Sequence, residues 1–241
     1  MNYSITNDTC VIHNGITKIG EREVEQILVN YKVLVLPSTL KSIGESAFEY
    51  KILLNRVALP CGLLRIGDRA FFGCDELEEI IIPDTVTYLG KSAFDMCKKL
   101  SRVTIGNGVT EIAESVFACC GMDSIVIPGS VTIIKESAFY GCHKLKKLEI
   151  PPAVTIEVGA FYKTPIEDIY LSGGPSLYGD LIKAFEDGVF GDVDLGECFA
   201  NIAGDRSWSV YGGITLHVPA GALAAYKSDP FFRKFDKIVI R

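Results

Sequence analysis

The feature that most constrains how this chain can fold is a phenylalanine that recurs every 22 or 23 residues. It is the second residue of a dipeptide such as Ala-Phe, and its six copies are Phe48, Phe71, Phe94, Phe117, Phe139 and Phe161. A second marker keeps the same spacing and is proline at five of six positions, which are Pro37, Pro60, Pro83, Gly106, Pro128 and Pro151. Two markers in phase over six units indicate an internal repeat, and units of this length are typical of chains that stack into a solenoid.

The segment before each proline marker predicts a short strand. In the unit that runs from Ile66 to Pro83, Ile80 and Ile82 occupy alternate positions, and β-branched residues in alternation favour a strand. Pro83 ends it, because proline cannot donate a hydrogen bond to a ladder. The same alternation predicts inward-facing pairs in seven strands: Leu34 and Leu36, Val57 and Leu59, Ile80 and Ile82, Val103 and Ile105, Ile125 and Ile127, Leu148 and Ile150, and Ile169 and Leu171.

The rest of each unit leads the chain back to the next strand. Val86 and Leu89 predict a second short extended piece, which Gly90 closes. Residues 92–97 are too few for a long helix, so we expect one helical or 3₁₀ turn whose Phe94 points inward. A unit of this size cannot bury its apolar face alone, and stacking would place phenylalanine on phenylalanine in a continuous ladder.

The start and end of the regular repeats define the expected domain organisation. We expect a single repeat domain over 1–241, with about seven repeats in 11–171. Residues 172–211 are rich in glycine and aspartate and are interpreted as an irregular insertion or a degenerate repeat, with a short helix near 181–187. Residues 212–241 are expected to cap the stack, with a helix at 220–227 after a strand and a final strand at 237–240.

Charge and hydropathy exclude several classes of protein. The net charge of −6 disfavours binding to nucleic acid or to an anionic membrane, since both need a basic surface. The chain has no run of 18 apolar residues, so we expect no membrane insertion. The first residues, MNYSITNDTCVIHNG, lack the features of a signal peptide, so the chain is either intracellular or begins after such a signal.

Two units, VTYLGKSAFDMCKKLSRVTIG and VTIIKESAFYGCHKLKKLEIP, carry a specific resemblance. They resemble the BspA-like leucine-rich repeats, and the resemblance covers residues 11–171 and 214–240. It implies a right-handed leucine-rich-repeat solenoid of the α/β repeat class, dominated by short parallel strands on one face. Members are mostly bacterial cell-surface or secreted proteins implicated in adhesion, and the family has no catalytic residues to transfer to this sequence.

The cysteines are interpreted as structural. Cys74, Cys97, Cys120 and Cys142 each follow a repeat phenylalanine by three residues and should therefore stack in a column. A cysteine locked to the repeat is most simply a small buried apolar residue, although neighbouring disulfides stay open as an alternative. The other four cysteines lack the paired spacing of a zinc site.

Two further groups of residues suggest chemistry only weakly. Cys142 and His143 are adjacent, but no third group accompanies them to form a nucleophilic site, and His143 is expected to face solvent. Asp187, Asp192, Asp194 and Glu197 cluster in one segment, yet their spacing does not match a calcium loop, so a solvated loop is the preferred interpretation. We therefore expect no catalytic residue, no cofactor and no metal site.

The outward-facing positions of the predicted strands are the most informative surface. One column of them comprises Val35, Ala58, Ile81, Thr104, Val126, Glu149, Tyr170 and His217. Its first half is apolar, which is unusual for an exposed stripe and indicates a contact site. We predict a protein-binding role for Val35, Ile81, Thr104, Val126 and Tyr170. The alternative is that the apolar members serve only strand propensity.

These observations favour a non-enzymatic protein–protein interaction or adhesion module. By resemblance it would be a bacterial cell-surface or secreted repeat protein, although a cytoplasmic location stays open. Its partner would be a protein, such as a host extracellular protein or another cell-surface protein. The alternative function is a structural spacer or stalk within a larger surface protein, with no ligand of its own.

Overall fold

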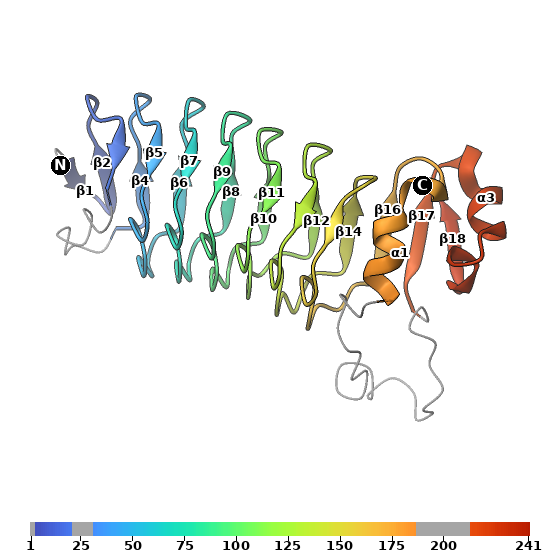
Figure 1. Cartoon of the computed structure of the whole chain (residues 1–241). Coiled ribbons are helices and arrows are strands. Elements are labelled where there is room, and N and C mark those ends of the chain that lie inside the picture. Colours follow the sequence, from blue (N-terminus) through green and yellow to red (C-terminus); the bar gives the residue numbers. More distant parts are fainter. Residues whose placement is uncertain (1–2, 21–30, 187–212) are drawn as a thin grey trace.

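The chain winds into a solenoid whose turns lie one after another along a single axis (Figure 1). This computed structural model describes residues 3–20, 31–186 and 213–241. Each turn contributes a strand to one long sheet, a two-residue strand to a second sheet and a series of turns to a third side. The predicted leucine-rich-repeat solenoid with parallel strands is confirmed.

The first sheet follows one side of the solenoid along the whole described chain, and its hydrogen-bond ladder is interrupted twice, between residues 56–58 and 79–81 and between residues 102–104 and 124–126. Paired neighbours lie in register, so that Arg102, Val103 and Thr104 lie beside Glu79, Ile80 and Ile81. Only its first pair, β1 with β2, is antiparallel. Its strands are β1 (Tyr3–Thr6), β2 (Thr9–Ile12), β4 (Val33–Val35), β6 (Arg56–Ala58), β8 (Glu79–Ile81), β10 (Arg102–Thr104), β12 (Ser124–Val126), β14 (Lys147–Ile150), β16 (Asp168–Leu171), β17 (Thr215–Val218) and β18 (Lys237–Ile240).

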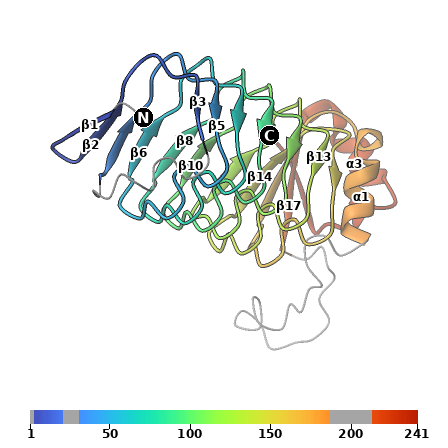
Figure 2. The same cartoon turned by 60° about the vertical axis from the view of Figure 1, so that its left-hand side comes forward.

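The second sheet lies on another side of the solenoid and is built from strands of two residues (Figure 2). Its hydrogen-bond ladder is interrupted once, between residues 88–89 and 111–112. In each strand the second side chain is buried, as for Ile66 and Leu89, and the first faces outward. These strands are β3 (Lys18–Ile19), β5 (Ser42–Ile43), β7 (Arg65–Ile66), β9 (Tyr88–Leu89), β11 (Glu111–Ile112), β13 (Ile133–Ile134) and β15 (Thr155–Ile156).

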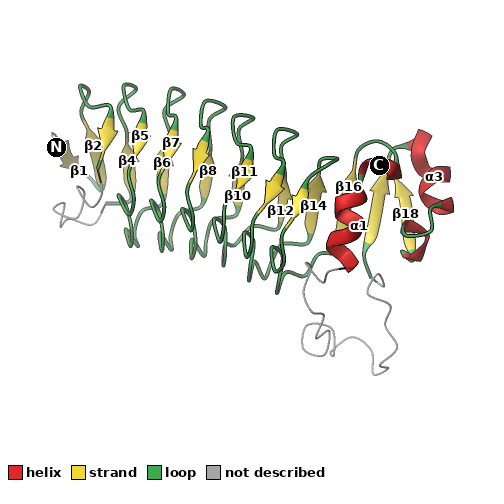
Figure 3. Cartoon of the chain, viewed as in Figure 1, coloured by secondary structure: helices red, strands yellow, loops and turns green. Residues whose placement is uncertain are grey.

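The third side differs from the expected helical turn. Within the described residues, Figure 3 shows only strands and loops before the first 3₁₀ helix, η1 (Pro175–Leu177). Ser92 and Met96, which flank Phe94, are left-handed at φ 50° and 61°, and a right-handed helix cannot pass through such residues. The Phe94 N–H instead donates to the Val116 carbonyl of the next turn at 2.9 Å. Hydrogen bonds between turns thus replace hydrogen bonds within a helix.

The repeat phenylalanines form the predicted ladder through the core. Their rings stack face to face, with centroids 5.0 to 5.7 Å apart from Phe48 to Phe161, and all six are fully buried. The inward strand residues pack beside them, and only Leu59 and Val103 among the predicted pairs are partly buried. Because the rings occupy the same place in every turn, each turn covers the apolar face of its neighbour.

The departure from proline at position 106 has a steric reason. A Cβ atom on Gly106 would lie 2.5 Å from the carbonyl carbon and oxygen of Pro83 in the preceding turn. No side chain can occupy this position unless the two turns move apart. The glycine therefore preserves the spacing of the stack where the sequence pattern is broken.

The repeat cysteines form a second column in the core, and all seven described cysteines are free thiols. Each repeat thiol donates a hydrogen bond to the phenylalanine carbonyl of the preceding turn, at 3.1 to 3.3 Å; these thiols belong to Cys74, Cys97, Cys120 and Cys142. Burial raises the pKa of Cys74 and Cys142 to about 12. Burial likewise raises the pKa of Cys97 and Cys120 well above the usual range. The thiols are free and buried, as the sequence predicted, and they also donate hydrogen bonds and stay protonated at neutral pH.

The C-terminal part closes the stack with helices. Helix α1 (Gly179–Glu186) contacts β15, at the end of the second sheet, while β17 and β18 continue the first sheet beyond β16. The expected helix at 220–227 is η2 (Ala220–Ala222) followed by α3 (Leu223–Ser228), which packs on β18. The short helix η3 (Phe232–Lys234) then leads into β18, the final strand expected at 237–240.

We predict that Phe94→Ala, in the middle of the ladder, lowers the free energy of unfolding by about 3–5 kcal/mol. The substitution removes a fully buried ring and leaves a cavity between Phe71 and Phe117. Urea unfolding followed by circular dichroism measures the loss, with the exposed Thr104→Ala as the control. Unfolding of Phe94→Ala at the wild-type urea concentration would contradict a ladder that stabilises the stack.

We also predict that the free energy of unfolding falls as the pH rises above 9. Thiols of the unfolded chain ionise near the ordinary pKa of 9.0, whereas Cys74 and Cys142 stay protonated in the folded chain until about pH 12. Each such thiol therefore lowers the free energy of unfolding by about 1.4 kcal/mol per pH unit within this window.

The measurement is urea unfolding at pH 7, 9 and 10.5 for wild type and for Cys142→Ala. The variant should lose stability less steeply above pH 9, because one buried thiol no longer resists ionisation. The exposed Cys61 provides the control, since Cys61→Ala should keep the wild-type slope. Equal slopes for Cys142→Ala and wild type would show that the buried thiol is not the cause.

Candidate binding surface

The outward column of the first sheet carries apolar side chains that are open to solvent. Val35 is 42% exposed, and Ile81 and Val126 are each 59% exposed. The strand register places Val35 beside Ala58 and Ile81 beside Thr104, and the members of the column occupy the same position in successive repeats. Alternation in the strands turns these side chains away from the core, as the sequence indicated.

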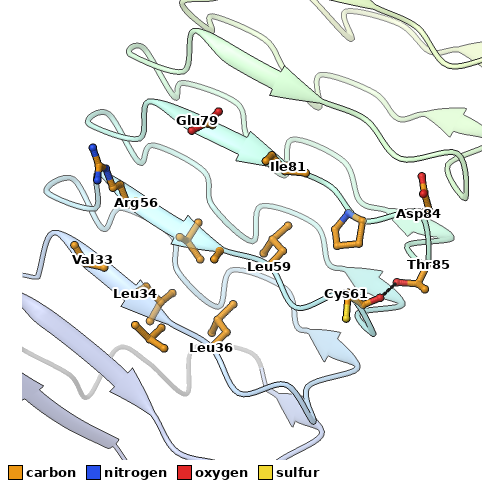
Figure 4. Close-up of a pocket in the computed structure, with 14 residues that line it drawn as sticks. Val33, Leu34, Leu36, Arg56, Leu59, Cys61, Glu79, Ile81, Asp84 and Thr85 are labelled. Carbon is orange, nitrogen blue, oxygen red and sulfur yellow. Dashed lines mark hydrogen bonds between the residues drawn. The ribbon is translucent and has the colours of Figure 1, made fainter.

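The first part of this column forms the floor of a groove of about 780 Å³ over β4, β6 and β8 (Figure 4). Ala58 lies between the larger Val35 and Ile81, and its small side chain leaves a gap between them. Strands are about 4.7–4.9 Å apart, so Val35 and Ile81, two strands apart, are separated by roughly 10 Å. This gap is wide enough for one apolar side chain of a partner.

One rim of the groove is basic. Arg56 and Glu79 lie at the start of β6 and β8, on the side of the groove opposite Asp84 and Thr85 (Figure 4). The Glu79 carboxylate pairs with Arg102 of the following strand, Oε1 to Nε at 3.3 Å. Within the part of the chain that the structure describes, the exposed Arg56 side chain has neither a hydrogen bond nor an ion pair. Its charge is therefore available to a ligand.

The opposite rim is polar and held in place by hydrogen bonds. The Thr85 hydroxyl donates to the carbonyl oxygens of Cys61 and Leu63, at 2.8 and 2.6 Å. The Asp84 Oδ1 atom accepts from the backbone N–H of Asn107 at 2.7 Å. These bonds join three consecutive turns, so this rim keeps a fixed shape beside the exposed Cys61 thiol.

The C-terminal part of the same column is closed by contacts within the protein. Tyr170 stacks on His217 at 4.2 Å between ring centroids, and the His217 Nε2 atom lies 2.7 Å from Asp168 Oδ1. The Arg241 guanidinium donates to Glu149 at 2.8 Å, across a sequence separation of 92 residues. Polar partners thus already satisfy this end, whereas the N-terminal groove keeps apolar groups in solvent.

The five residues predicted to bind protein do not lie in one site. Val35 and Ile81 line the groove, and Thr104 lies in register beside Ile81. Val126 is exposed on the next strand, β12, outside the groove. Tyr170 is only partly exposed and lies at the closed end of the column, in contrast to the exposed position expected from strand alternation. The binding role of all five residues stays a prediction.

Sequence reasoning missed the two rims. A second outward column has mixed charges and resembles an ordinary solvated face; it comprises Val33, Arg56, Glu79, Arg102, Ser124, Lys147 and Asp168. Nothing in its spacing shows that Glu79 pairs with Arg102 rather than with Arg56. Cys61, Asp84 and Thr85 follow the proline marker, where the repeat pattern is least constrained. The only available signal was the run of apolar letters in the neighbouring outward column.

The weaker candidates for chemistry form no site in the described residues. The Cys142 thiol is buried and bonded to Phe117, whereas His143 is exposed, so the two side chains point to different surroundings. No group of three or more metal-ligating side chains occurs in 3–20, 31–186 or 213–241. The acidic set of Asp187, Asp192, Asp194 and Glu197 lies outside the described residues. None of the described helices is both long enough and apolar enough to cross a membrane.

Two solved structures resemble this chain in fold. A leucine-rich cell surface protein from Faecalibacterium prausnitzii A2-165 is 28% identical, with a TM-score of 0.53 over 68% of this chain and 54% of that one. A leucine-rich repeat protein from Bacteroides ovatus ATCC 8483 is 21% identical, with a TM-score of 0.52 over 73% and 64% of the two chains. This chain therefore spans less than two thirds of either structure. Among curated proteins, none matches the sequence.

The family comparison agrees with the geometry of the turns. The family described as the BspA type leucine rich repeat region matches residues 3–89 and 64–180, in six copies. These matches cover well over half of the sequence and include every strand of the groove. The chain belongs to the BspA-type leucine-rich repeat family.

Proposed function

We propose that this chain is a non-enzymatic protein-binding module that contacts its partner through the N-terminal groove. The observation that carries the proposal is the exposed apolar line of Val35, Ala58 and Ile81 on the floor of that groove. Exposed apolar side chains gathered in a concave surface are typical of interaction sites, since their burial by a partner is favourable.

The groove lies on a rigid support, which favours binding. Beneath it, β4 and β6 are held by their parallel register, β8 by its register with β10, and all three turns by the phenylalanine stack, which favours a fixed shape. The outer face of these strands presents the side chains of alternate residues, so recognition through this face depends on those side chains.

We further infer the setting of this module from its relatives. The similar protein from Faecalibacterium prausnitzii is described as a cell surface protein, and this supports a surface or secreted location and a role in adhesion for the present chain. Its partner would then be a host extracellular protein or another cell-surface protein. We also infer that residues 1–241 act as one repeat domain, because strands on both sides of 172–211 join the same sheet.

A spacer without a ligand is the second candidate, and it rests on the regularity of the stack. Successive turns are tied by the phenylalanine ladder and by surface ion pairs such as Lys98 with Asp75 and Lys99 with Glu76. Such a rod could separate other domains without binding anything itself. The two functions differ in whether changes in the groove alter any interaction.

We predict that a triple variant, Val35→Asp with Ile81→Asp and Val126→Asp, folds like wild type but no longer binds the partner. All three side chains are exposed, so a carboxylate there stays solvated in the free protein but must lose water in a complex. Wild type and the triple variant are compared by surface plasmon resonance on an array of purified secreted and cell-surface proteins. Circular dichroism verifies that both are folded.

Leu64→Asp is the matched control, because Leu64 is 48% exposed and lies next to β7 of the second sheet. It should bind like wild type. Unfolding of the triple variant would show that its residues are core, and unchanged binding would exclude this face as the site. Failure of wild type to bind any protein of the array would favour the spacer.

We also predict that Ala58→Leu lowers the affinity for such a partner by about tenfold or more, because the larger side chain fills the gap between Val35 and Ile81. Ala58 is exposed, so the substitution should leave the unfolding curve unchanged. Titration of the partner measures the affinity. Equal affinity for the variant and wild type would show that no partner side chain enters this gap.

A further inference from the structure

The chemistry of the groove also defines the kind of segment that fits it. We propose that the groove binds an extended segment of another protein in which an apolar residue and an acidic residue stand two positions apart. The inference rests on the proposed function, since it names the partner of the same groove. It combines three observations: the gap at Ala58, the charge at Arg56, and the spacing between them.

The apolar residue is assigned to the gap at Ala58. This position is flanked by Val35 on one side and Ile81 on the other, both of them exposed. An aliphatic or aromatic side chain placed there would contact both walls and remove them from water. A single anchor in a central pocket is the usual source of binding energy in a small interface.

The acidic residue is assigned to Arg56. Its guanidinium is exposed beside the apolar floor, and the nearest acidic side chain of the next strand, Glu79, is paired with Arg102. A carboxylate suits an arginine because it can accept two parallel hydrogen bonds from the guanidinium. The net charge of the chain is −6, so an acidic ligand needs such a local positive group to offset the repulsion.

The spacing follows from the strand. Arg56 and Ala58 are two residues apart on β6 and face the same side, which corresponds to roughly 6.5 Å along a strand. An extended ligand has the same period of two, so its side chains at alternate positions match this distance when it lies along β6. The apolar residue then occupies the gap while the residue two positions away reaches Arg56.

The opposite rim makes the site asymmetric. The Asp84 carboxylate is exposed and fixed by its bond to Asn107, and it lies across the groove from Arg56. A second acidic residue on the other side of the apolar anchor would face this charge and be repelled. We therefore expect one carboxylate per segment, on the Arg56 side only.

The test uses a phage-displayed library of random heptapeptides, selected on the full chain and counter-selected on Ile81→Asp. Peptides that depend on Ile81 should be enriched in Asp or Glu two positions from Leu, Ile, Val, Met or Phe. Selected peptides should bind Arg56→Glu about tenfold or more weakly than wild type, because attraction becomes repulsion. Lys147→Glu is the matched control, because it makes the same change of charge at the position of β14 that corresponds to Arg56 in β6, outside the groove.

The outcomes separate this inference from the proposed function. In one outcome, the selected peptides need Ile81 yet show no enrichment in acidic residues and bind Arg56→Glu like wild type. The groove then binds protein, but the assignment of an acidic residue to Arg56 is wrong. If Lys147→Glu weakens binding as much as Arg56→Glu, the effect is one of net charge and the assignment to Arg56 fails. If no peptide depends on Ile81, the groove itself is not a binding site and the proposed function falls as well.

Discussion

The structure depends on the stacking of the same residue in successive turns. A single turn has no interior of its own, so Phe94 is buried only because Phe71 and Phe117 lie on either side of it. The hydrogen bonds follow the same rule, since the Phe94 N–H and the Cys97 thiol both bond to carbonyl groups of neighbouring turns. Stability in such a protein is a property of contacts between neighbours rather than of any one repeat.

This dependence leaves only some positions free for function. Within the turn that contains β8, the repeated Leu77, Ile80 and Ile82 are buried in the stack. The positions that do not repeat, Glu79 and Ile81, lie on the outer face of the first sheet and line the groove. Toward the C-terminus the same face is covered by internal contacts, where Tyr170 stacks on His217, His217 bonds to Asp168, and Arg241 bonds to Glu149. The groove proposed as a binding surface therefore lies over the N-terminal turns, away from this closed end.

Prediction from the sequence succeeded for positions whose burial or direction is set by the regular spacing of the repeat. The phenylalanine and cysteine columns, the inward strand pairs and the final strand all follow from periodicity and alternation. The turns around Phe94 could not be predicted as they are, because Ser92 and Met96 carry no signal for a left-handed backbone. Their conformation is imposed by bonds to the next turn, which a single repeat does not contain. The α1 position against β15 likewise depends on the open end of the second sheet.

The candidate site divides in the same way. Periodicity alone predicts the stack, the two sets of strands and the outward direction of Val35, Ile81 and Val126. The tertiary structure decided that Ala58 leaves a gap, that Glu79 pairs with Arg102 rather than with Arg56, and that Tyr170 is covered by His217. The physical reason is that periodicity specifies which way a side chain points, whereas the choice among neighbours depends on distances between strands that are remote in the sequence.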